Sequence, residues 1–535
     1  MELAQAPRPG PGVTRYLAAT SKWTVYGVLI GILAGFAAIV FHVALEAVGE
    51  YLFQAPAGYD PPSPGQRHIP GSPERDYTWW LIVLIPAAGG LLAGLLVWRF
   101  CPEAGGDGTN GMIRSFHRDN GRVKFRVMWV KLLASVFTIG SGGSAGREGP
   151  STQIGGAIGS SVARLFRLSE RDCRILLLAG SSAGVGAIFR APLGGALFSG
   201  EVLYRDTDNE AEALIPCVVA SIVAYSVFIG FLPGAPTEGT FAVDKTKMVF
   251  DDPTELVWYA VLGCLCALMG LVYVKALGVI EKIYRALRVP RMVLPAIGGA
   301  SLGLFALVVG AATQNINYNV FGGGHGLIQA AMDESFTWTV LLILLLAKIV
   351  ATGITLGSGG SGGLFAPSLA IGALLGGLVG GVLVDLQYVQ HAGPFVLVGM
   401  GGFFAGVGKV PITAVIMVSE ITKSYELLAP IMLAAAIAFQ LSRNWTLFEE
   451  QVNNRLVSPA HSGDFVVDVL EQLYVKDVYD AARQPTLIKE STPLRRVLIL
   501  VAQSDSRYFP VVDANDRMTG IFSLTDIRRV MTEHE

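Results

Sequence analysis

A glycine-rich segment that runs into a proline occurs twice in this sequence, and it limits most strongly how the chain can fold. The first copy covers residues 140–150 and the second covers residues 357–368. The two copies align without gaps at an offset of 217 residues (357 minus 140), and the same offset pairs Lys131 with Lys348. Hydrophobic segments that are interrupted by glycine and proline at matching positions of two halves indicate a transport site between internal repeats.

Each copy is followed by a run of small and apolar residues that we expect to form a closely packed helix. Proline suits the first turn of a helix, and glycine lets the preceding backbone turn sharply. Such a helix points free N–H groups and a positive dipole end toward the segment before it, which makes an anion site. Glu148 carries the charge that this site attracts. We expect its carboxylate to occupy the site and to leave it on protonation or displacement by a dissolved anion.

The composition indicates a polytopic helical membrane protein. Of the 535 residues, 52% are hydrophobic and only 15% are charged, which is too apolar for a soluble enzyme of this length. The net charge of −2 implies no general affinity for nucleic acid. The five cysteines lack metal-ligand spacing, and no nucleophile with a neighbouring base stands out. We therefore expect neither an enzyme nor a resident metal.

The order of apolar and polar segments predicts the domain organisation. Residues 1–22 form a polar leader, in which Arg8, Arg15 and Lys22 favour a cytoplasmic start. Residues 23–448 form the membrane region, with repeats at about 80–235 and 290–448. Many of its apolar pieces are shorter than the roughly 20 residues of a straight crossing. The predicted fold is therefore all-α, with two inverted repeats of tilted, broken helices.

A change of composition near residue 449 predicts a separate soluble unit. Residues 449–472 form a polar linker, and residues 473–535 form a small α/β domain. Strands are expected at 486–488, 508–512 and 518–523, and helices at 494–503 and 527–531.

Three motifs of the membrane region resemble the signature loops of the CLC family of anion channels and proton-coupled anion transporters. They are Gly146-Arg147-Glu148-Gly149-Pro150, Gly363-Leu364-Phe365-Ala366-Pro367 and Gly105-Gly106-Asp107-Gly108. The resemblance extends over about residues 20–460. It implies a homodimer with one pore in each subunit, and anions bound between helix N-termini near the middle of the membrane.

The resemblance also implies roles for individual residues. Glu148 matches the gating glutamate. Lys131 matches a buried lysine that raises the potential of the pore, and the alternative is a lysine that snorkels to the membrane surface. The positions that the resemblance places around the anion are Asp107, Gly108, Thr109, Gly146, Arg147, Gly149, Leu364, Phe365, Ala366 and Phe448. Arg147 is interpreted as structural or as a contributor to the local potential.

Two of these positions depart from the family pattern. Asp107 replaces a serine whose hydroxyl donates to the anion. Three explanations are open for this aspartate. Its carboxyl group is protonated and donates to the anion, or its carboxylate turns away and caps the following helix, or the substrate is unusual. We favour the helix cap. Phe448 replaces a tyrosine on the last membrane helix, with Tyr425 and Trp445 as alternative matches. Anion binding would then rest on backbone N–H groups, with Thr109 or Asn110 as a further donor.

A third departure bears on the mode of transport. Antiporters of the family tend to carry a second glutamate at the position of Val202, after Glu201. The valine favours a passive, voltage- or pH-gated chloride channel. A proton-coupled antiporter, a transporter of a non-halide ion suggested by Asp107, and a non-conducting membrane sensor remain alternatives. Glu201 is interpreted as a helix-end partner, with Arg205 as a candidate contact.

The C-terminal unit resembles a single CBS domain. The resemblance places Ser523 and Asp526 where such domains contact the ribose of an adenine nucleotide, which would be the only cofactor. Because the family uses CBS domains in pairs, we favour a regulatory or dimer-stabilising cap over nucleotide binding. We expect a multi-pass protein of a prokaryotic inner membrane, with both termini in the cytoplasm, that interacts with lipid, chloride or another small anion, and protons.

Overall fold

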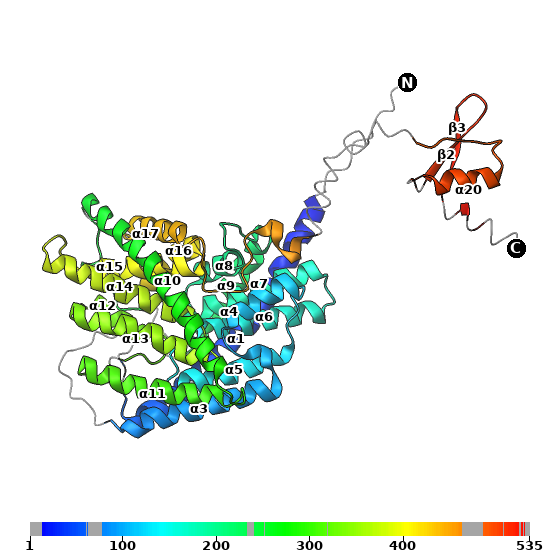
Figure 1. Ribbon diagram of the computed structural model, residues 1–535. Helices are drawn as coiled ribbons and strands as arrows, with labels where there is room; N and C mark the ends of the chain where they lie inside the picture. Colours follow the sequence, from blue (N-terminus) through cyan, green and yellow to red (C-terminus); the bar gives the residue numbers. More distant parts are fainter. Residues whose placement is uncertain are drawn as a thin grey trace. The chain divides into compact units, whose positions relative to one another are not determined.

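The computed structural model describes residues 13–59, 61, 77–232, 240–244, 246–250, 252–317, 319–462, 485–504, 506, 508–523, 526–527 and 529. The chain divides into two compact units, Met1–Ser462 and Gly463–Glu535. The first unit is helical, and the second is a small α/β domain (Figure 1).

The first unit contains two series of helices that succeed each other along the chain. Its N-terminal part comprises α1 (Val13–Val48), a π-helical turn η1 (Gly49–Gln54), α2 (Ala55–Ala57), α3 (Trp79–Phe100), η2 (Pro102–Ala104), α4 (Gly108–Arg118), α5 (Phe125–Gly140), α6 (Glu148–Leu165), α7 (Glu170–Phe189), α8 (Pro192–Glu201), η3 (Ala211–Ala213) and α9 (Leu214–Phe231). Its C-terminal part comprises η4 (Pro253–Glu255), α10 (Leu256–Ala286), α11 (Leu294–Thr313), α12 (His325–Met332), α13 (Trp338–Gly357), α14 (Phe365–Asp385), α15 (Gly393–Gly408), α16 (Pro411–Thr422), α17 (Leu428–Leu441), η5 (Arg455–Val457) and η6 (Pro459–His461).

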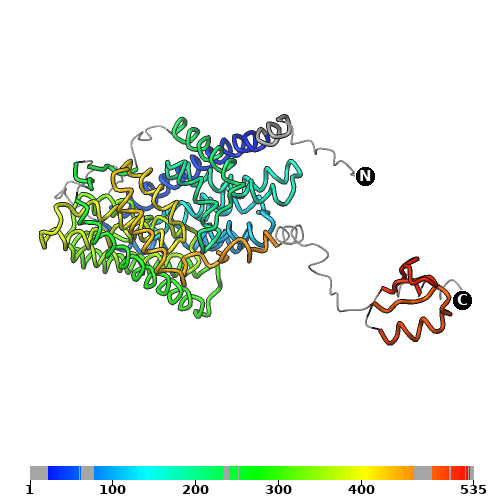
Figure 2. Tube along the Cα trace, turned by 90° about the horizontal axis from the view of Figure 1, so that it is seen from above, coloured from blue at the N-terminus to red at the C-terminus, as the bar shows by residue number. Residues whose placement is uncertain are grey.

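Eight helices of the described residues are long and apolar enough to cross a membrane. The helices α15, α16 and α17 are apolar but shorter. Helices α4 to α7 lie on one side and α12 to α15 on the other, while α3 runs along α11 (Figures 1 and 2). This architecture confirms the predicted fold of interrupted helices in two inverted repeats.

Two hydrogen bonds between the repeats follow the sequence duplication. The backbone N–H of Ser144 donates to Thr355 Oγ1 over 3.0 Å, and the backbone N–H of Ser361 donates to Thr138 Oγ1 over 3.2 Å. Both the donors and the acceptors differ by the offset of 217 residues. Each repeat therefore makes the same contact to the other, as expected for a pseudo-symmetric pair.

Small residues allow the central helices to pack closely. A Cβ atom at Gly159 of α6 would overlap the carbonyl of Leu176 in α7, and one at Gly376 of α14 would overlap the carbonyl of Phe395 in α15. These equivalent contacts explain why both repeats place glycine-rich runs after the duplicated motif. Without a Cβ atom the backbones approach closely, which is how helices associate inside a membrane.

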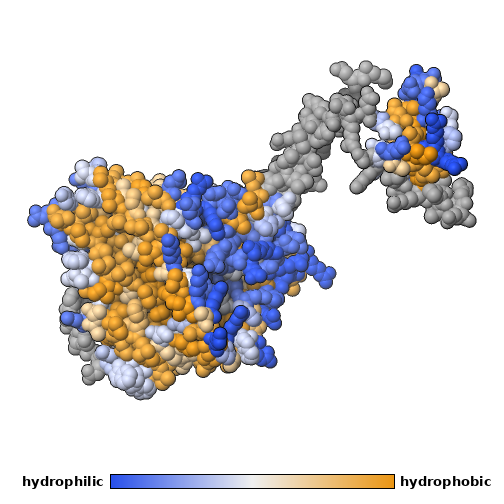
Figure 3. All heavy atoms as spheres, in the orientation of Figure 1, coloured by the Kyte–Doolittle hydropathy of each residue, from blue (hydrophilic) through white to orange (hydrophobic). Residues whose placement is uncertain are grey.

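Apolar side chains cover much of the visible face of the first unit, over α10 to α15, whereas polar side chains gather over α4 to α7 (Figure 3). Large apolar side chains that are exposed on membrane-length helices include Leu84, Trp98, Val261, Leu268, Leu304 and Val308. Exposed apolar surface of this extent is normal for a protein that faces lipid.

The membrane unit extends beyond both predicted limits. Helix α1 begins at Val13, inside the expected leader, of which residues 1–12 lie outside the described part. The expected linker at 449–472 starts as part of the membrane unit, because the N–H groups of Arg205 and Asp206 donate to the carbonyls of Val452 and Asn453. Residues 463–472 lie outside the described residues.

The second unit contains β1 (Ile488–Lys489), α20 (Leu494–Ala502), β2 (Tyr508–Val512) and β3 (Met518–Ser523). Strand β2 pairs parallel with β1 and antiparallel with β3. Phe509 is fully buried and packs with Ile488 and Val497. The predicted strands and first helix are thus present, and most of the expected helix at 527–531 lies outside the described residues.

Candidate functional site

The three glycine-rich loops meet inside the membrane unit. The N–H of Gly146 donates to the carbonyl of Gly363 over 2.8 Å, and the N–H of Gly362 donates to the carbonyl of Gly106 over 3.3 Å. A Cβ atom at Gly149 would lie 2.7 Å from the Cα atom of Gly363. Segments that are more than 200 residues apart in the chain therefore converge at one point, as the duplication predicted.

The helices α6 and α14 start at this point, and the side chain of the residue before each helix does not cap its first N–H groups. Helix α6 begins at Glu148 after Arg147, and helix α14 begins at Phe365 after Leu364, and neither preceding residue forms a side-chain cap. The uncapped N–H groups and the positive ends of the two helix dipoles favour negative charge between them.

The carboxylate of Glu148 lies at this junction. The residue is buried, and among the described residues neither carboxylate oxygen has a hydrogen-bond partner at ordinary geometry. A Cβ atom built on Gly146 would overlap Glu148 Oε2 and would lie 3.1 Å from the backbone nitrogen of Ala366. The carboxylate therefore lies beside the first turn of α14, at the position that a bound anion would be expected to take.

Two cavities approach the junction. One, of about 420 Å³, is lined among others by Arg147, Glu46, Gly323 and His325, and we call it the Arg147 cavity. The other, of about 720 Å³, is lined among others by Asp107, Arg114, Gln153 and Glu450, and we call it the Asp107 cavity.

Glu148 lines neither cavity, but its neighbours contribute to one each. Arg147 precedes it in the chain, and Asp107 Oδ1 lies 2.7 Å from the position of a Cβ atom on Gly149. Glu148 therefore lies in the chain between Arg147, which lines one cavity, and Gly149, which is close to a residue that lines the other.

Asp107 caps α4 and also reaches the second repeat. Its Oδ2 accepts the N–H of Asn110 over 3.0 Å, and its Oδ1 accepts the N–H of Leu364 over 3.3 Å. The favoured interpretation as a helix cap is confirmed. The second contact was not foreseen: the carboxylate uses a backbone donor that the resemblance assigns to the anion. Thr109 is buried in the first turn of α4, and a Cβ atom at Gly108 would overlap the carbonyl of Gly149.

Lys131 and Lys348 occupy equivalent positions and are both fully buried. Lys131 Nζ donates to the carbonyl of Gly106 over 2.6 Å, and Lys348 Nζ donates to the carbonyl of Gly322 over the same distance. Lys131 therefore does not snorkel to a membrane surface. Each lysine supports the glycine loop that precedes α4 or α12 and brings a positive charge close to the junction.

Arg147 turns its side chain toward α1. Its guanidinium lies 3.1 Å from His42 Nδ1, and His42 Nε2 lies 3.1 Å from Glu46 Oε1. These contacts agree with the interpretation of Arg147 as structural or as a contributor to the local potential.

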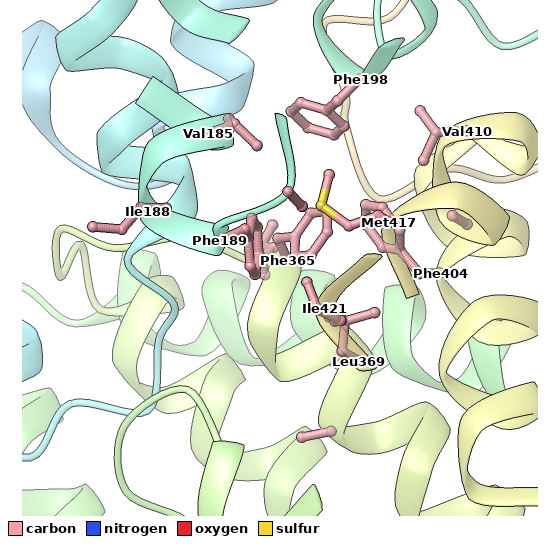
Figure 4. Packing of buried hydrophobic residues seen from close by; sticks show 14 of the residues in the cluster. Val185, Ile188, Phe189, Phe198, Phe365, Leu369, Phe404, Val410, Met417 and Ile421 are labelled. Atoms are coloured by element: carbon pink, nitrogen blue, oxygen red, sulfur yellow. The ribbon is translucent and has the colours of Figure 1, made fainter. Parts of the chain in front are cut away.

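Phe365 anchors the start of α14 in an aromatic cluster (Figure 4). Its ring centroid lies 4.5 Å from that of Phe189, 4.1 Å from that of Phe404 and 5.7 Å from that of Phe198. Phe198 and Met417 reach this cluster from α8 and α16 (Figure 4). Packing on all sides of the ring holds the adjoining backbone N–H groups in place.

Phe448 is fully buried in the segment after α17, whereas the alternative match Tyr425 has 57% of its surface exposed. The N–H of Glu450 donates to Asn110 Oδ1 over 3.3 Å, which brings this segment next to α4. The other alternative, Trp445, has a buried Nε1 without a partner that lies toward Gly270 of α10. Of the three residues, only Phe448 has no polar side-chain atom.

Two residues near the junction were missed by the sequence analysis. Tyr273 of α10 is fully buried and lies beside Ser368, and among the described residues its hydroxyl makes no hydrogen bond of ordinary geometry. It stands in a long apolar run that gives no signal of a polar role. His325 begins α12, and its Nε2 lies 3.9 Å from Glu148 Oε1. The repeat offset, which pairs His325 with Gly108, was a usable signal.

Glu201 and Val202 lie on the far end of α8. Glu201 Oε1 accepts the N–H of Ile412 over 3.0 Å, and Oε2 accepts the N–H of Thr413 over 2.8 Å. Glu201 is therefore a helix-end partner, as expected. Its contact is the start of α16, so the prediction of a contact with Arg205 was wrong. Val202 is fully buried, and its carbonyl accepts Gln451 Nε2 over 2.9 Å.

In the second unit, Ser523 and Asp526 bind each other. The N–H of Ser523 donates to Asp526 Oδ2 over 2.9 Å, and its hydroxyl donates to the same oxygen over 2.7 Å. These two bonds, the hydroxyl contribution first, lower the pKa of Asp526. The pair forms a local turn, and a nucleotide would have to compete with these contacts.

Comparison with known proteins identifies the families to which the two units are similar. Residues 89–443 match the family described as voltage gated chloride channel, and residues 475–533 match the CBS domain. The H(+)/Cl(-) exchange transporter ClcA of Cronobacter sakazakii is 32% identical over 427 residues, which cover 78% of this chain and 85% of the relative.

Solved structures share the fold. A slow cyanobacterial Cl-/H+ antiporter has a TM-score of 0.66 at 20% identity, and the match covers 84% of this chain and 98% of the antiporter chain. A CLC-type fluoride/proton antiporter has a TM-score of 0.66 at 19% identity, and the match covers 83% of this chain and 99% of the antiporter. A eukaryotic CLC transporter has a TM-score of 0.62 at 19% identity, and the match covers 97% of this chain and 90% of the transporter. From the family match over most of the membrane unit and a relative above 30% identity, the chain belongs to the voltage gated chloride channel (CLC) family of anion-transporting membrane proteins, and it carries a C-terminal CBS domain.

Proposed function

We propose that this protein exchanges chloride for protons across the membrane, and that Glu148 is the group that both species use. The observation that carries this proposal is the 32% identity with an H(+)/Cl(-) exchange transporter over 78% of the chain. The passive channel favoured by Val202 alone has no comparable support, and exchange takes its place as the leading interpretation.

The geometry of Glu148 supports this mechanism. The charged carboxylate lies at the first turn of α14, beside the Ala366 nitrogen, and none of its oxygens is held by a hydrogen bond. A chloride ion seeks the same positive helix ends, so the two anions compete for one place. A protonated Glu148 has no net charge and gives up the place. The binding of chloride thereby becomes linked to the uptake of a proton.

The anion site in this proposal rests mainly on backbone. The N–H groups of Phe365, Ala366 and Gly149 belong to the uncapped starts of α14 and α6, while Asp107 occupies that of Leu364. The buried charges of Lys131 and Lys348 raise the potential of the surrounding region. Gly146 and Gly108 contribute close backbone approach, and Phe448 contributes an apolar wall near α4.

The far end of the proton path carries no glutamate at position 202. A proton that leaves Glu148 on the side of the Asp107 cavity must therefore travel through water in that cavity, which is lined by polar residues such as Gln153 and Glu450. This arrangement predicts slower proton transfer on that side than on the side of the Arg147 cavity.

Simultaneous flux measurements test the proposal. Liposomes that contain the protein and a high chloride concentration are diluted into low chloride, and chloride efflux and internal pH are followed together. Exchange predicts that chloride efflux drives protons uphill into the liposomes at a constant ratio. Chloride efflux without uphill proton movement would restore the channel, and no flux of any small anion would leave a membrane sensor.

Glu148→Gln tests the assignment of the gate. It resembles the protonated carboxyl in shape and charge, so chloride flux should persist while proton coupling is lost. Glu50→Gln is the matched control, since Glu50 is an exposed carboxylate that lines the Arg147 cavity and belongs to none of the three glycine-rich loops. Retained proton coupling in Glu148→Gln would exclude Glu148 as the shared group.

We also propose that the protein is a homodimer with both termini in the cytoplasm of a prokaryotic cell. The dimer rests on the family and the orientation on Arg8, Arg15 and Lys22. Light scattering of the detergent-solubilised protein should give twice the chain mass, and a single chain mass would contradict the dimer.

A further inference from the structure

His325 lies between the Arg147 cavity and Glu148. It is the first residue of α12, its side chain is 17% exposed, and it lines that cavity together with Gly323. Its Nε2 lies 3.9 Å from Glu148 Oε1. The two groups face each other from different repeats.

The two ring nitrogens point in different directions. Nε2 faces Glu148, whereas Nδ1 lies 3.0 Å from the position of a Cβ atom on Gly323, a residue of the cavity wall. Phe241 stacks on the ring with an interplanar angle of 21° and a centroid distance of 6.1 Å, which limits its rotation. The ring therefore lies between the wall of the Arg147 cavity and Glu148, with Nε2 toward the carboxylate.

We propose that His325 is the proton-transfer residue between the Arg147 cavity and Glu148. This inference rests on the proposed proton-coupled exchange and names the route by which the proton enters on one side. An imidazole suits this task because each nitrogen can accept or donate a proton.

The transfer balances in protons and bonds. A hydronium ion in the cavity gives a proton to Nδ1, where an N–H bond forms, and an O–H bond of the hydronium ion breaks to leave water. The N–H bond at Nε2 breaks, and an O–H bond forms on Glu148 Oε1. One proton has then moved from the cavity to the carboxyl, and the ring has changed its tautomer. The distance of 3.9 Å exceeds a hydrogen bond by about 1 Å, and catalytic contacts commonly tighten to hydrogen-bond length during transfer.

Charged groups from the surrounding elements also face His325. Among the described residues they are Glu148 of α6, Arg147 before α6, Lys348 of α13, and Glu46 and Glu50, which line the same cavity. Arg147 and Lys348 are occupied by contacts to His42 and to backbone carbonyls, and Glu46 contacts His42. Of these groups, Glu148 is the one that has an ion-pair contact with His325.

The first test replaces the imidazole with a group that cannot relay a proton. His325→Gln should lower the rate of coupled proton and chloride movement tenfold or more, since a positioned acid–base group contributes about 10²–10⁴ in rate. Chloride binding, measured by calorimetry, should change less than twofold. His391→Gln is the matched control, because His391 lines neither cavity, and it should keep the normal rate.

A second test separates proton transfer from a structural role. In a Glu148→Gln background chloride moves without protons, so adding His325→Gln should leave that chloride flux unchanged. An equal loss of flux in both backgrounds would mean that His325 only supports the pore, and it would overturn the proposal.

Chemical rescue gives a readout that packing cannot produce. His325→Ala leaves space next to a cavity of about 420 Å³, so imidazole added to the solution should restore at least part of the coupled rate. No rescue, together with a normal rate in His325→Gln, would reject the proton route.

Failure of the proposed function would look different. If the wild-type protein passes chloride without moving protons uphill, exchange is wrong. His325 is then judged by the pH dependence of chloride flux on the side of the Arg147 cavity, because it would still deliver the proton that opens the gate. An unchanged pH dependence in His325→Gln would reject the inference in that case as well.

Discussion

At the scale of single residues, Asp107 has the most unusual position in the site. Its carboxylate holds the first turn of α4 through Asn110 and reaches across to the N–H of Leu364 in the other repeat. A negative charge that already uses one backbone donor of α14 competes with an anion for the same helix end. We therefore expect Asp107 to stabilise the join between the repeats and to lower the affinity for an anion.

Asp107→Ser tests this competition. Serine keeps a helix cap, frees the Leu364 N–H and removes the charge, so chloride should bind about tenfold more tightly, or about 1.4 kcal/mol. Isothermal titration with chloride measures the change. Asp107→Asn is the control that removes the charge but keeps an acceptor; equal affinity in wild type and both variants would show that Asp107 does not affect the anion.

Tyr273 places a hydroxyl near Ser368 of α14, and among the described residues this hydroxyl makes no hydrogen bond of ordinary geometry. Because this hydroxyl is buried and unpaired near the start of α14, we expect it to donate to a bound anion. Tyr273→Phe should weaken chloride binding by about 1 kcal/mol, roughly fivefold, without loss of thermal stability.

Tyr259→Phe on the same helix is the matched control for Tyr273. The Tyr259 hydroxyl donates to Glu255 Oε2 over 3.0 Å, outside the site. This control should keep its chloride affinity, and a loss of affinity in both variants would point to a general disturbance of α10.

At the scale of helices, α8 and α16 cap each other. Glu201 at the end of α8 accepts the first N–H groups of α16, and Glu420 near the end of α16 accepts the N–H groups of Leu193 and Gly194 in α8, over 3.2 and 2.7 Å. These reciprocal contacts follow the same pseudo-symmetry that relates the central motifs of the two repeats. Each carboxylate satisfies donors that a short helix inside the membrane would otherwise leave unpaired.

Glu201→Gln should therefore act on stability and leave transport stoichiometry alone. Charge-assisted bonds to backbone are worth about 1.5–3 kcal/mol each, so the midpoint of thermal unfolding in detergent should fall by several degrees. The ratio of chloride to protons, measured in liposomes, should stay at the wild-type value. A changed ratio would show instead that Glu201 carries protons.

At the scale of the whole molecule, the membrane unit includes the segment that precedes the CBS domain. His117 of α4 lies 2.8 Å from Ser458 Oγ, and Glu210 Oε1 lies 2.8 Å from His461 Nε2. These four side chains are buried. The segment 449–462 thus secures the helix that carries Asp107, and it ends where the second unit begins.

Two truncations test this boundary. A chain that ends after residue 462 should remain monodisperse on size exclusion and keep its coupled flux. A chain that ends after residue 448 leaves the buried His117 and Glu210 without these partners, which costs about 1–3 kcal/mol for each unsatisfied group, and it should unfold at lower temperature. Equal behaviour of the two truncated chains would contradict the assigned boundary.

The sequence by itself determined the class of fold, the duplication and the identity of the gate candidate. These follow from patterns that act locally: apolar composition demands a membrane, and glycine and proline mark where helices begin. Pairs such as Lys131 and Lys348 or Ser144 and Ser361 were predictable because duplication repeats the sequence together with its contacts.

Only the tertiary structure decided which side chains share the site. The approach of His325 and Tyr273 to the junction, the second contact of Asp107 and the exchange between α8 and α16 all join residues that are distant in the chain. No local preference encodes such distances, because they depend on how the two repeats pack against each other. The sequence specifies where helices begin and therefore where free backbone N–H groups lie. The packing of the repeats decides which charged side chains contact those N–H groups.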